Sequence, residues 1–223
     1  MQYLFSDKAG DSSLKLKGEE YKYLFKVRRH NLEDTLYFRQ KDKSEELYKY
    51  KVISLDGRSA SLELISSEKK VIKAKKHLHI AWCVIDPKSV EKVLPSLNEI
   101  GVSKITFIFC DRSQKNYKID LKRYARILET SSQQCGRNES IEFDIVKNIS
   151  DFIQINPETV VLDFCDEVLS CKNDVQTVLI GCEGGFSDEE REQVEKLKRF
   201  RLDTPMILRS ESAAMAIASK VLI

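Results

Sequence analysis

A glycine-rich segment near the C-terminus carries the residues best suited to hold a ligand. It reads Gly181-Cys182-Glu183-Gly184-Gly185-Phe186-Ser187 and directly follows the apolar run 176–180. Its three glycines let the backbone bend tightly and bring N–H and C=O groups close to a ligand. The segment lacks the Gly-Lys-Ser/Thr ending of a P-loop, and its glycine spacing differs from that of a dinucleotide fingerprint. From spacing alone, a purely structural turn is as good an interpretation as a ligand loop.

A second segment with possible chemistry lies just before the C-terminal helix. It reads Ile207-Leu208-Arg209-Ser210-Glu211-Ser212-Ala213 and leads into an apolar stretch rich in alanine. Small residues let helices pack closely. The pattern therefore predicts a terminal helix that lies either in a core or at an interface.

The elements that must position these segments alternate between strand and helix from residue 77 onward. Ser187 and Glu190 have the spacing of a capping box, which fixes the start of a helix after the glycines. The other elements are strands over 77–85, 104–110, 159–165 and 176–180 and helices over 88–100 and 120–134. Continuous apolar strands are typical of a parallel sheet covered on both faces, and the alternation predicts an α/β fold. In such sheets, ligands bind at the carboxyl ends of the strands.

The first 70 or so residues have a different pattern, of short strands separated by polar turns. Strands are expected over 35–38, 47–53 and 60–65, a short helix over 19–27, and a hairpin turn at Asp56-Gly57. Several short strands in so little chain predict a small β-barrel. A lysine-rich stretch over 68–76 marks the boundary, so we expect two domains, 1–72 and 73–223.

Charge is distributed unevenly between these two parts. Residues 1–76 carry 18 Lys and Arg against 12 Asp and Glu, whereas residues 77–223 carry 19 against 23. A net +6 beside a net −4 indicates that the first part meets a polyanion, although a solvated lysine-rich surface explains the charge equally well. No signal peptide or membrane-spanning stretch is evident, so a soluble, cytoplasmic protein is expected.

Metal and disulfide chemistry find little support in the sequence. The six cysteines show no C-x-x-C spacing, and most lie in apolar runs, which indicates reduced thiols in a core. His77 and His79 alternate on a strand and could share a face, but no third ligand is evident. We expect no metal.

Taken together, the motifs resemble those of the bacterial 16S rRNA N3-uridine methyltransferases, which belong to the SPOUT superfamily. The glycine segment and the Ile207–Ala213 segment are similar to the paired signature of that family. Further resemblances, in the same order along the chain, are Val27-Arg28-Arg29, Glu33-Asp34, Asn98-Glu99-Ile100-Gly101-Val102, Arg112-Ser113, Lys122-Arg123-Tyr124 and Gln133-Gln134-Cys135-Gly136-Arg137. The chain departs from the pattern at Cys182, where the family has proline, at Asp203-Thr204 and at Met206.

The resemblance implies a fold, a cofactor and an assembly. It implies a C-terminal SPOUT-type α/β domain with a deep trefoil knot, preceded by a PUA-like N-terminal β-barrel, in a homodimer. The implied cofactor is S-adenosylmethionine, and an apolar slot with glycine backbone groups suits its adenine. The cofactor-binding residues implied by the resemblance are Leu162, Gly181, Gly184, Gly185, Ile207 and Leu208.

The implied reaction is methyl transfer to N3 of a uridine in 16S rRNA, in the assembled small ribosomal subunit. N3 lies on the Watson–Crick edge, so the base must be unpaired, and its proton must be lost. The candidate catalytic residues are Arg112, Arg137, Glu183 and Arg209: Arg112 or Arg137 to hold the base or a phosphate, and Glu183 to orient the loop or assist deprotonation. Arg209 could equally be a structural ion-pair partner. Lys26, Arg28 and Arg29 would contact the RNA backbone.

Three other functions stay open. One is another SPOUT RNA methyltransferase, acting at a ribose 2′-oxygen of tRNA, and a second is a non-catalytic RNA-binding module. A nucleotide-dependent oxidoreductase fits the fold class, but no dinucleotide fingerprint supports it.

Overall fold

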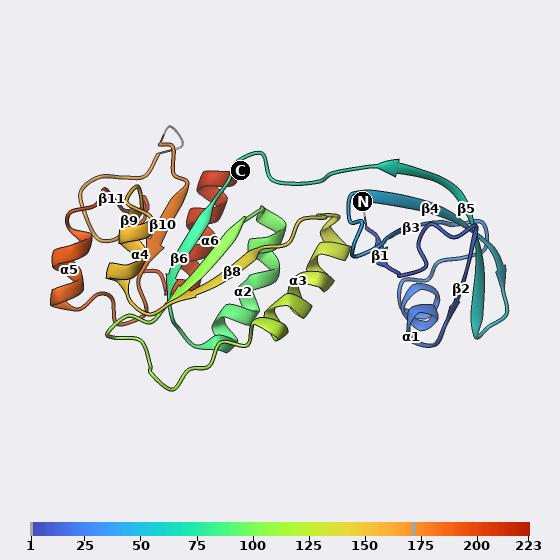
Figure 1. The fold of residues 1–223 in the computed structure, drawn as a ribbon, viewed down its shortest axis with the longest axis horizontal. Coiled ribbons are helices and arrows are strands. Elements are labelled where there is room, and N and C mark those ends of the chain that lie inside the picture. The colour runs from blue at the N-terminus through green and yellow to red at the C-terminus, as the bar shows by residue number, and fades with distance from the viewer. Residues whose placement is uncertain (1, 171–172) are drawn as a thin grey trace. The chain divides into compact units, whose positions relative to one another are not determined.

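A computed structural model describes residues 2–170 and 173–223, which divide into two compact units (Figure 1). The first unit extends to Ile72 and also includes Gln133–Glu139; the second contains Lys73–Ser132 and Ser140–Ile223. Each unit has its own hydrophobic core. Among the described residues, the helices are all too short or too polar to cross a membrane. Cys171, one of the six cysteines, lies outside the described residues.

The first unit is built on a five-stranded sheet with the order β1-β3-β4-β5-β2. β1 pairs with β3 in parallel, and the other neighbours are antiparallel. Its elements are β1 (Leu4–Phe5), β2 (Ser13–Lys17), α1 (Gly18–Tyr21), the π-helix η1 (Lys22–Val27), β3 (Thr35–Arg39), β4 (Glu46–Leu55) and β5 (Ser59–Lys69). The predicted strands over 35–38, 47–53 and 60–65 correspond to β3, β4 and β5. Because β1 and β2 stand at opposite ends of this order, the strand pairing describes a sheet and does not by itself close a barrel.

The predicted helix over 19–27 is helical but not a uniform α-helix. After α1 the chain widens into η1, where the Arg28 N–H donates to the Tyr23 carbonyl oxygen at 2.9 Å, five residues back. The next residue, Arg29, has a φ of +61° and turns the chain away from the helix. Wide turns of this kind are frequent at functional sites because they project side chains that a regular helix would space differently.

The second unit is a six-stranded, fully parallel sheet with the order β11-β9-β10-β6-β7-β8. This confirms the α/β prediction. Its strands are β6 (His79–Cys83), β7 (Lys104–Ile108), β8 (Glu142–Val146), β9 (Val160–Leu162), β10 (Thr177–Ile180) and β11 (Arg199–Phe200). Its helices are α2 (Pro87–Ile100), α3 (Leu121–Cys135), α4 (Ile149–Ile155), α5 (Asp188–Val194) and α6 (Ser210–Leu222). The central strand β6 is buried along its whole length, as the apolar residues that follow His79 predict.

Helix ends in this unit are set by local chemistry that can be read in the sequence. α2 begins after Asp86, whose side chain accepts the Ser89 N–H, with Pro87 in the first turn. It ends at Gly101, where φ is +109° and a Cβ would lie 2.7 Å from that of Ala74, so only glycine fits. α2 and α3 lie side by side (Figure 1), joined by hydrogen bonds from Asn98 to Ser131 and Ser132.

Candidate functional site

A cavity of the second unit lies at the carboxyl ends of three neighbouring strands, β9, β10 and β11. It encloses about 470 Å³ and is lined by the segments that follow these strands and by the start of α6. This is the edge at which ligands bind in open α/β sheets, because loops from adjacent strands converge there.

All six residues expected to bind a cofactor line this one cavity. Leu162 ends β9, while Gly181, Gly184 and Gly185 follow β10; Ile207 and Leu208 precede α6. The segments are far apart in the sequence, and the parallel sheet brings them together because β9 and β10 are hydrogen-bonded neighbours.

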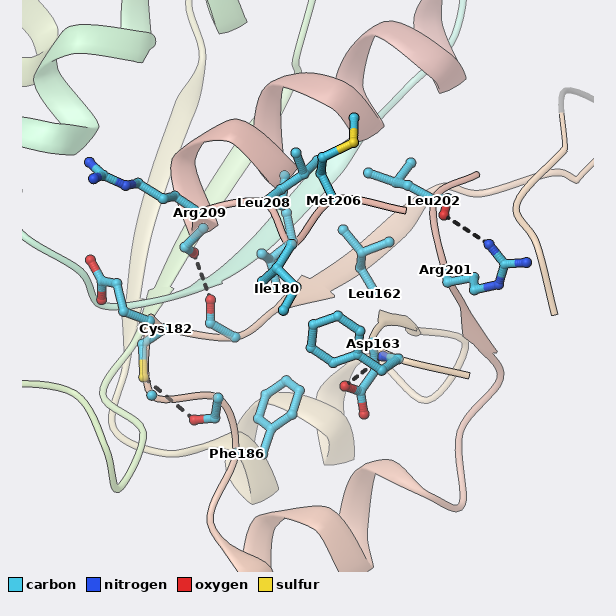
Figure 2. A pocket seen from close by; sticks show the side chains of 18 of the residues that line it. Leu162, Asp163, Ile180, Cys182, Phe186, Arg201, Leu202, Met206, Leu208 and Arg209 are labelled. Atoms are coloured by element: carbon cyan, nitrogen blue, oxygen red, sulfur yellow. Dashed lines mark hydrogen bonds between the residues drawn. The ribbon is translucent and has the colours of Figure 1, made fainter. Parts of the chain in front are cut away.

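The interior of the cavity is apolar, with polar groups at its edges. Leu162, Ile180 and Leu208 converge at its centre, with Phe186 below them (Figure 2). The glycine loop, residues 181–185, completes the wall. An apolar slot bordered by backbone donors and acceptors is the usual surrounding of a heteroaromatic ring such as adenine.

The shape of the glycine loop depends on two of its glycines. Gly185 has a φ of +68°, and its N–H donates to the Cys182 carbonyl oxygen at 2.9 Å, which closes a tight turn. A Cβ on Gly184 would lie only 3.2 Å from the Cβ of Arg112. That close approach lets Arg112 Nη1 donate to the Gly184 carbonyl oxygen at 2.8 Å. Glycine therefore suits the positive φ at position 185, and at position 184 a larger residue would force the Arg112 side chain to shift.

A hydrogen-bond network connects the glycine loop to the loop after β7. Glu190 is buried, and its carboxylate accepts the Ser187 N–H and the Asp111 N–H, each at 2.9 Å. The Ser187 hydroxyl donates to Asp111 Oδ2 at 2.6 Å, and Ser187 Oγ in turn accepts the Glu190 N–H. Burial raises the pKa of Glu190, while the two backbone N–H groups oppose that shift. The predicted capping box is confirmed, and it also fixes the loop that carries Arg112.

Three of the four candidate catalytic residues surround the glycine loop. Glu183 and Arg209 line the cavity, and Arg112 is bonded to Gly184. All three side chains are exposed. The guanidinium group of Arg209 extends away from the apolar centre of the cavity (Figure 2), so it can reach a ligand that approaches from outside.

Arg137, the fourth candidate, is placed elsewhere. It is buried in the segment 133–139, which belongs to the first unit, and its backbone oxygen accepts the Tyr3 hydroxyl at 2.7 Å. It does not line the cavity. Sequence reasoning could not foresee this, because the end of α3 belongs to a different unit from its beginning.

Charged residues that sequence reasoning missed also line the cavity. Asp163 follows β9 directly, and Arg191 Nη1 lies 3.4 Å from its Oδ2 atom; Arg201 follows β11. A polar residue at the end of a buried strand is a usable signal, and Asp163 carries it. The predicted strand over 159–165 hid that signal because it extended past Leu162, where β9 ends. Arg201 gave no signal, since the two-residue strand β11 is too short to detect from a pattern.

Cys182 stands where the resembled family has proline, and it acts as a small buried filler. Its Sγ lies 3.6 Å from Cys110 Sγ and 3.5 Å from the Gly185 carbonyl oxygen (Figure 2). The hydrogen bond to Cys110 and burial both raise the pKa of the Cys182 thiol, so it stays neutral. All five cysteines in the described residues are free thiols.

The three residues expected to contact RNA lie together on η1 and the turn that follows it. Lys26 Nζ is 5.9 Å from the centre of the Tyr21 ring, and Arg28 Nε donates to the Tyr23 hydroxyl at 3.1 Å. Arg29 is exposed on the turn. Side chains of Lys26, Arg28 and Arg29 form no ion pair with a carboxylate among the described residues, so their charges remain available.

No cluster of three or more metal-ligating side chains occurs within residues 2–170 and 173–223. His79 has a structural partner instead, because its Nε2 lies 2.7 Å from the Thr106 hydroxyl in the core.

Comparison with known proteins finds relatives that match nearly the whole chain. Residues 73–222 match the family described as RNA methyltransferase domain. The chain is 36% identical over 223 residues to a ribosomal RNA small subunit methyltransferase E from Helicobacter pylori, with 98% of each chain covered. A protein of the same name from Aquifex aeolicus is 27% identical, again with 98% of each chain covered.

Two solved structures share the fold over nearly the full length. A methyltransferase from Legionella pneumophila in complex with SAM superposes with a TM-score of 0.74 at 22% identity, covering 98% of this chain and 94% of that one. A Neisseria gonorrhoeae ribosomal RNA small subunit methyltransferase E bound to S-adenosyl methionine gives 0.72 at 15% identity, with 98% and 95% covered.

Proposed function

Because this chain belongs to the ribosomal RNA small subunit methyltransferase E family, within the RNA methyltransferase domain family, we propose that it methylates 16S rRNA with S-adenosylmethionine, at N3 of one uridine. The observation that carries the proposal is the convergence of all six expected cofactor residues on a single cavity. Two relatives of this fold hold the same cofactor in their solved structures.

The residues present fit this cofactor. Leu162, Ile180 and Leu208 provide an apolar slot for adenine, and the glycine loop brings the backbone close to that slot. The Asp163 carboxylate can accept hydrogen bonds from ribose hydroxyls or from the amino group of the methionine part. When bound, the cofactor supplies an electrophilic methyl group on sulfur.

The polar residues around the loop suit the remaining chemistry. N3–H of uracil is a weak acid, so the reaction needs a proton acceptor and a cation that stabilises the developing negative charge. We assign proton acceptance at N3 to the exposed Glu183 carboxylate. Arg112, held by Gly184, and Arg209 can stabilise the charge that develops on the uracil oxygens. Arg137 is less suited to this role because it is buried in the first unit.

The remaining expectations concern the fold and the assembly. We propose that the chain preceding α6 passes through a trefoil knot and that the five-stranded sheet of the first unit forms a PUA-like barrel.

A homodimer is supported by apolar side chains at the rim of the cavity, since Phe164, Met206 and Ile207 are 75%, 64% and 82% exposed. Sedimentation at equilibrium tests the dimer, and a monomer at micromolar concentration contradicts it.

The RNA-binding role belongs to the first unit in this proposal. Lys26, Arg28 and Arg29 would contact phosphates, and the substrate would be the small subunit as an assembled particle in the cytoplasm. Their unpaired charges are the supporting observation, because counterion release favours cations that carry no carboxylate partner.

The decisive experiment has two steps. Isothermal titration of the protein with S-adenosylmethionine should show micromolar binding. Small subunits lacking the modification are then incubated with protein and cofactor, and their rRNA is digested to nucleosides. A 3-methyluridine product supports the proposal, whereas a 2′-O-methylated nucleoside would assign the chain to another reaction. RNA binding without cofactor binding would identify a non-catalytic module.

A further inference from the structure

The first unit contains a second cavity, of whose lining the proposed function uses Arg28 alone. We define it as the Tyr23 pocket; it encloses about 270 Å³ and shares no lining residue with the cofactor cavity. Its walls come from the chain around β1, from η1 and the turn after it, from β3, and from the last turn of α3. The side chains relevant here are Tyr23, Arg28, His30, Tyr37, Gln133 and Gln134.

One wall of the pocket is aromatic and open to solvent. Tyr23 is 40% exposed, and Tyr37 on β3 is half-buried. An accessible aromatic face next to a cavity is the feature on which unpaired nucleobases stack, because every base has a π-face.

A cation is held in a fixed position against that wall. The guanidinium carbon of Arg28 lies 5.4 Å from the centre of the Tyr23 ring, and Arg28 Nε donates to the Tyr23 hydroxyl at 3.1 Å. The wide turn of η1 enforces this pairing, because the Arg28 N–H also donates to the Tyr23 carbonyl oxygen. The side chain is therefore preorganised, and little rotamer entropy is lost when an anion binds it.

The carboxylates nearest in the sequence do not compete for Arg28. Glu33 is ion-paired with Lys51, and Asp34 accepts from the Asn31 N–H and lies 3.1 Å from His30 Nδ1. Both acids thus have other partners, so the positive charge of Arg28 and Arg29 faces solvent beside the aromatic wall.

Polar groups suited to a base edge complete the pocket. Gln133 Oε1 accepts the Phe5 N–H at 2.9 Å, which fixes the amide and leaves its Nε2 as a donor. Gln134 is exposed, and His30 is half-buried. Amides and imidazoles of this kind recognise the hydrogen-bonding edges of unstacked bases in single-stranded RNA.

We propose that the Tyr23 pocket binds one unpaired nucleotide of the RNA, distinct from the base that is methylated. The base would stack on Tyr23, the amides of Gln133 and Gln134 would contact its edge, and Arg28 would bind its phosphate. The inference rests on the proposed function, since methylation of a Watson–Crick edge requires a single-stranded target region whose neighbouring nucleotides are also accessible.

The test uses the full chain and a mixed-sequence, single-stranded decaribonucleotide, with the duplex of the same sequence for comparison. Tyr23→Ala should weaken single-strand binding about tenfold and leave duplex binding little changed, because loss of one stacked base has an effect of this order. Tyr23→Phe keeps the ring for stacking and loses only the hydroxyl that holds Arg28, so it should bind the single strand more tightly than Tyr23→Ala does. Arg28→Ala should weaken binding and reduce the salt dependence of log K by about 0.7. The control is Arg58→Ala, which removes the same charge from the β4–β5 turn, outside the pocket. It should change neither the preference for single-stranded over duplex RNA nor the KM for small subunits.

Crosslinking and the kinetics of methylation make the outcome unambiguous. Decaribonucleotides carrying 4-thiouridine should crosslink within the pocket, at Tyr23 or Tyr37, as mapped by mass spectrometry. Equal single-strand affinity of a folded Tyr23→Ala protein, or crosslinks confined to other surfaces, would overturn the proposal. So would crosslinking of this wall to a ribosomal protein within small subunits. If wild type methylates small subunits and Tyr23→Ala does not raise the KM, the pocket assignment alone fails; if wild type does not methylate them, the proposed function fails.

Discussion

At the scale of single residues, the Ser210 hydroxyl connects the core to the glycine loop. It accepts Trp82 Nε1–H at 2.8 Å and donates to the Gly181 carbonyl oxygen at 2.6 Å. Ser210→Ala should lower the unfolding free energy by about 1–3 kcal/mol, because the buried indole N–H loses its acceptor. It should also weaken cofactor binding measured by calorimetry, since Gly181 loses its support. The matched change Ser212→Ala, exposed on the same helix, should alter neither quantity, and equal effects of both would contradict this role.

Glu183 is the residue on which the assignment of proton acceptance depends. Glu183→Gln preserves the size of the side chain but removes the carboxylate, so the single-turnover rate of methyl transfer should fall about 100-fold or more, as expected for loss of a general base. Glu189→Gln neutralises another exposed carboxylate, at the start of α5, and serves as the control. An undiminished rate for Glu183→Gln would assign the loss of the proton to water.

His79 gives a prediction about pH. Burial, followed by repulsion from Lys104, lowers the pKa of His79 from 6.5 to about 4 in the folded protein. Between pH 4 and about 6.5, His79 therefore binds a proton in the unfolded chain but not in the folded protein. The free energy of unfolding falls as the pH drops through this range. The loss due to this residue is about 3 kcal/mol. Denaturant unfolding should show this slope in wild type and in a variant with the exposed His77→Gln, but not in His79→Gln; a slope that survives in His79→Gln would exclude the histidine as its source.

At the scale of elements, the capping box of α5 stabilises both the start of that helix and the loop that carries Arg112. Ser187→Ala removes the cap and the bond to Asp111, so it should lower stability by about 1 kcal/mol and also loosen the loop that carries Arg112. The control is Asn148→Ala, which removes the cap of α4, where Asn148 accepts the Asp151 N–H at 2.7 Å. Both should lower the midpoint of thermal unfolding, but only Ser187→Ala should reduce the rate of methyl transfer. If Asn148→Ala reduces that rate equally, the effect is one of general stability.

At the scale of the whole molecule, the basic character of the first unit should control association with RNA. Replacing Lys26, Arg28 and Arg29 together by alanine should reduce the slope of log K against log salt by about 2, at roughly 0.7 per phosphate on single-stranded RNA. Filter binding of small subunits across a range of salt concentrations measures this slope. Cofactor affinity should be unchanged in this variant, because the charges belong to a different unit from the cofactor cavity. A wild-type slope in the triple variant would move the RNA-binding surface elsewhere.

Much of this protein can be determined from its sequence alone, wherever the information is local. The parallel α/β order, the capping box at Ser187 and the turn formed by the three glycines all follow from periodicity, caps and backbone freedom within a few residues. The six expected cofactor residues came instead from the family resemblance, and the structure places them around one cavity.

Only the tertiary structure decides which distant segments share a site. It adds Asp163 and Arg201 to the cavity, moves Arg137 to the first unit, and joins Gln133 to Tyr23 in a second pocket. The wide turn of η1 and the two-residue strands β1 and β11 are equally hidden, since they are too short or too irregular to produce a period. The physical reason is that a sequence pattern records which side chains are buried, whereas distances between segments far apart in the chain depend on how strands pair and layers pack.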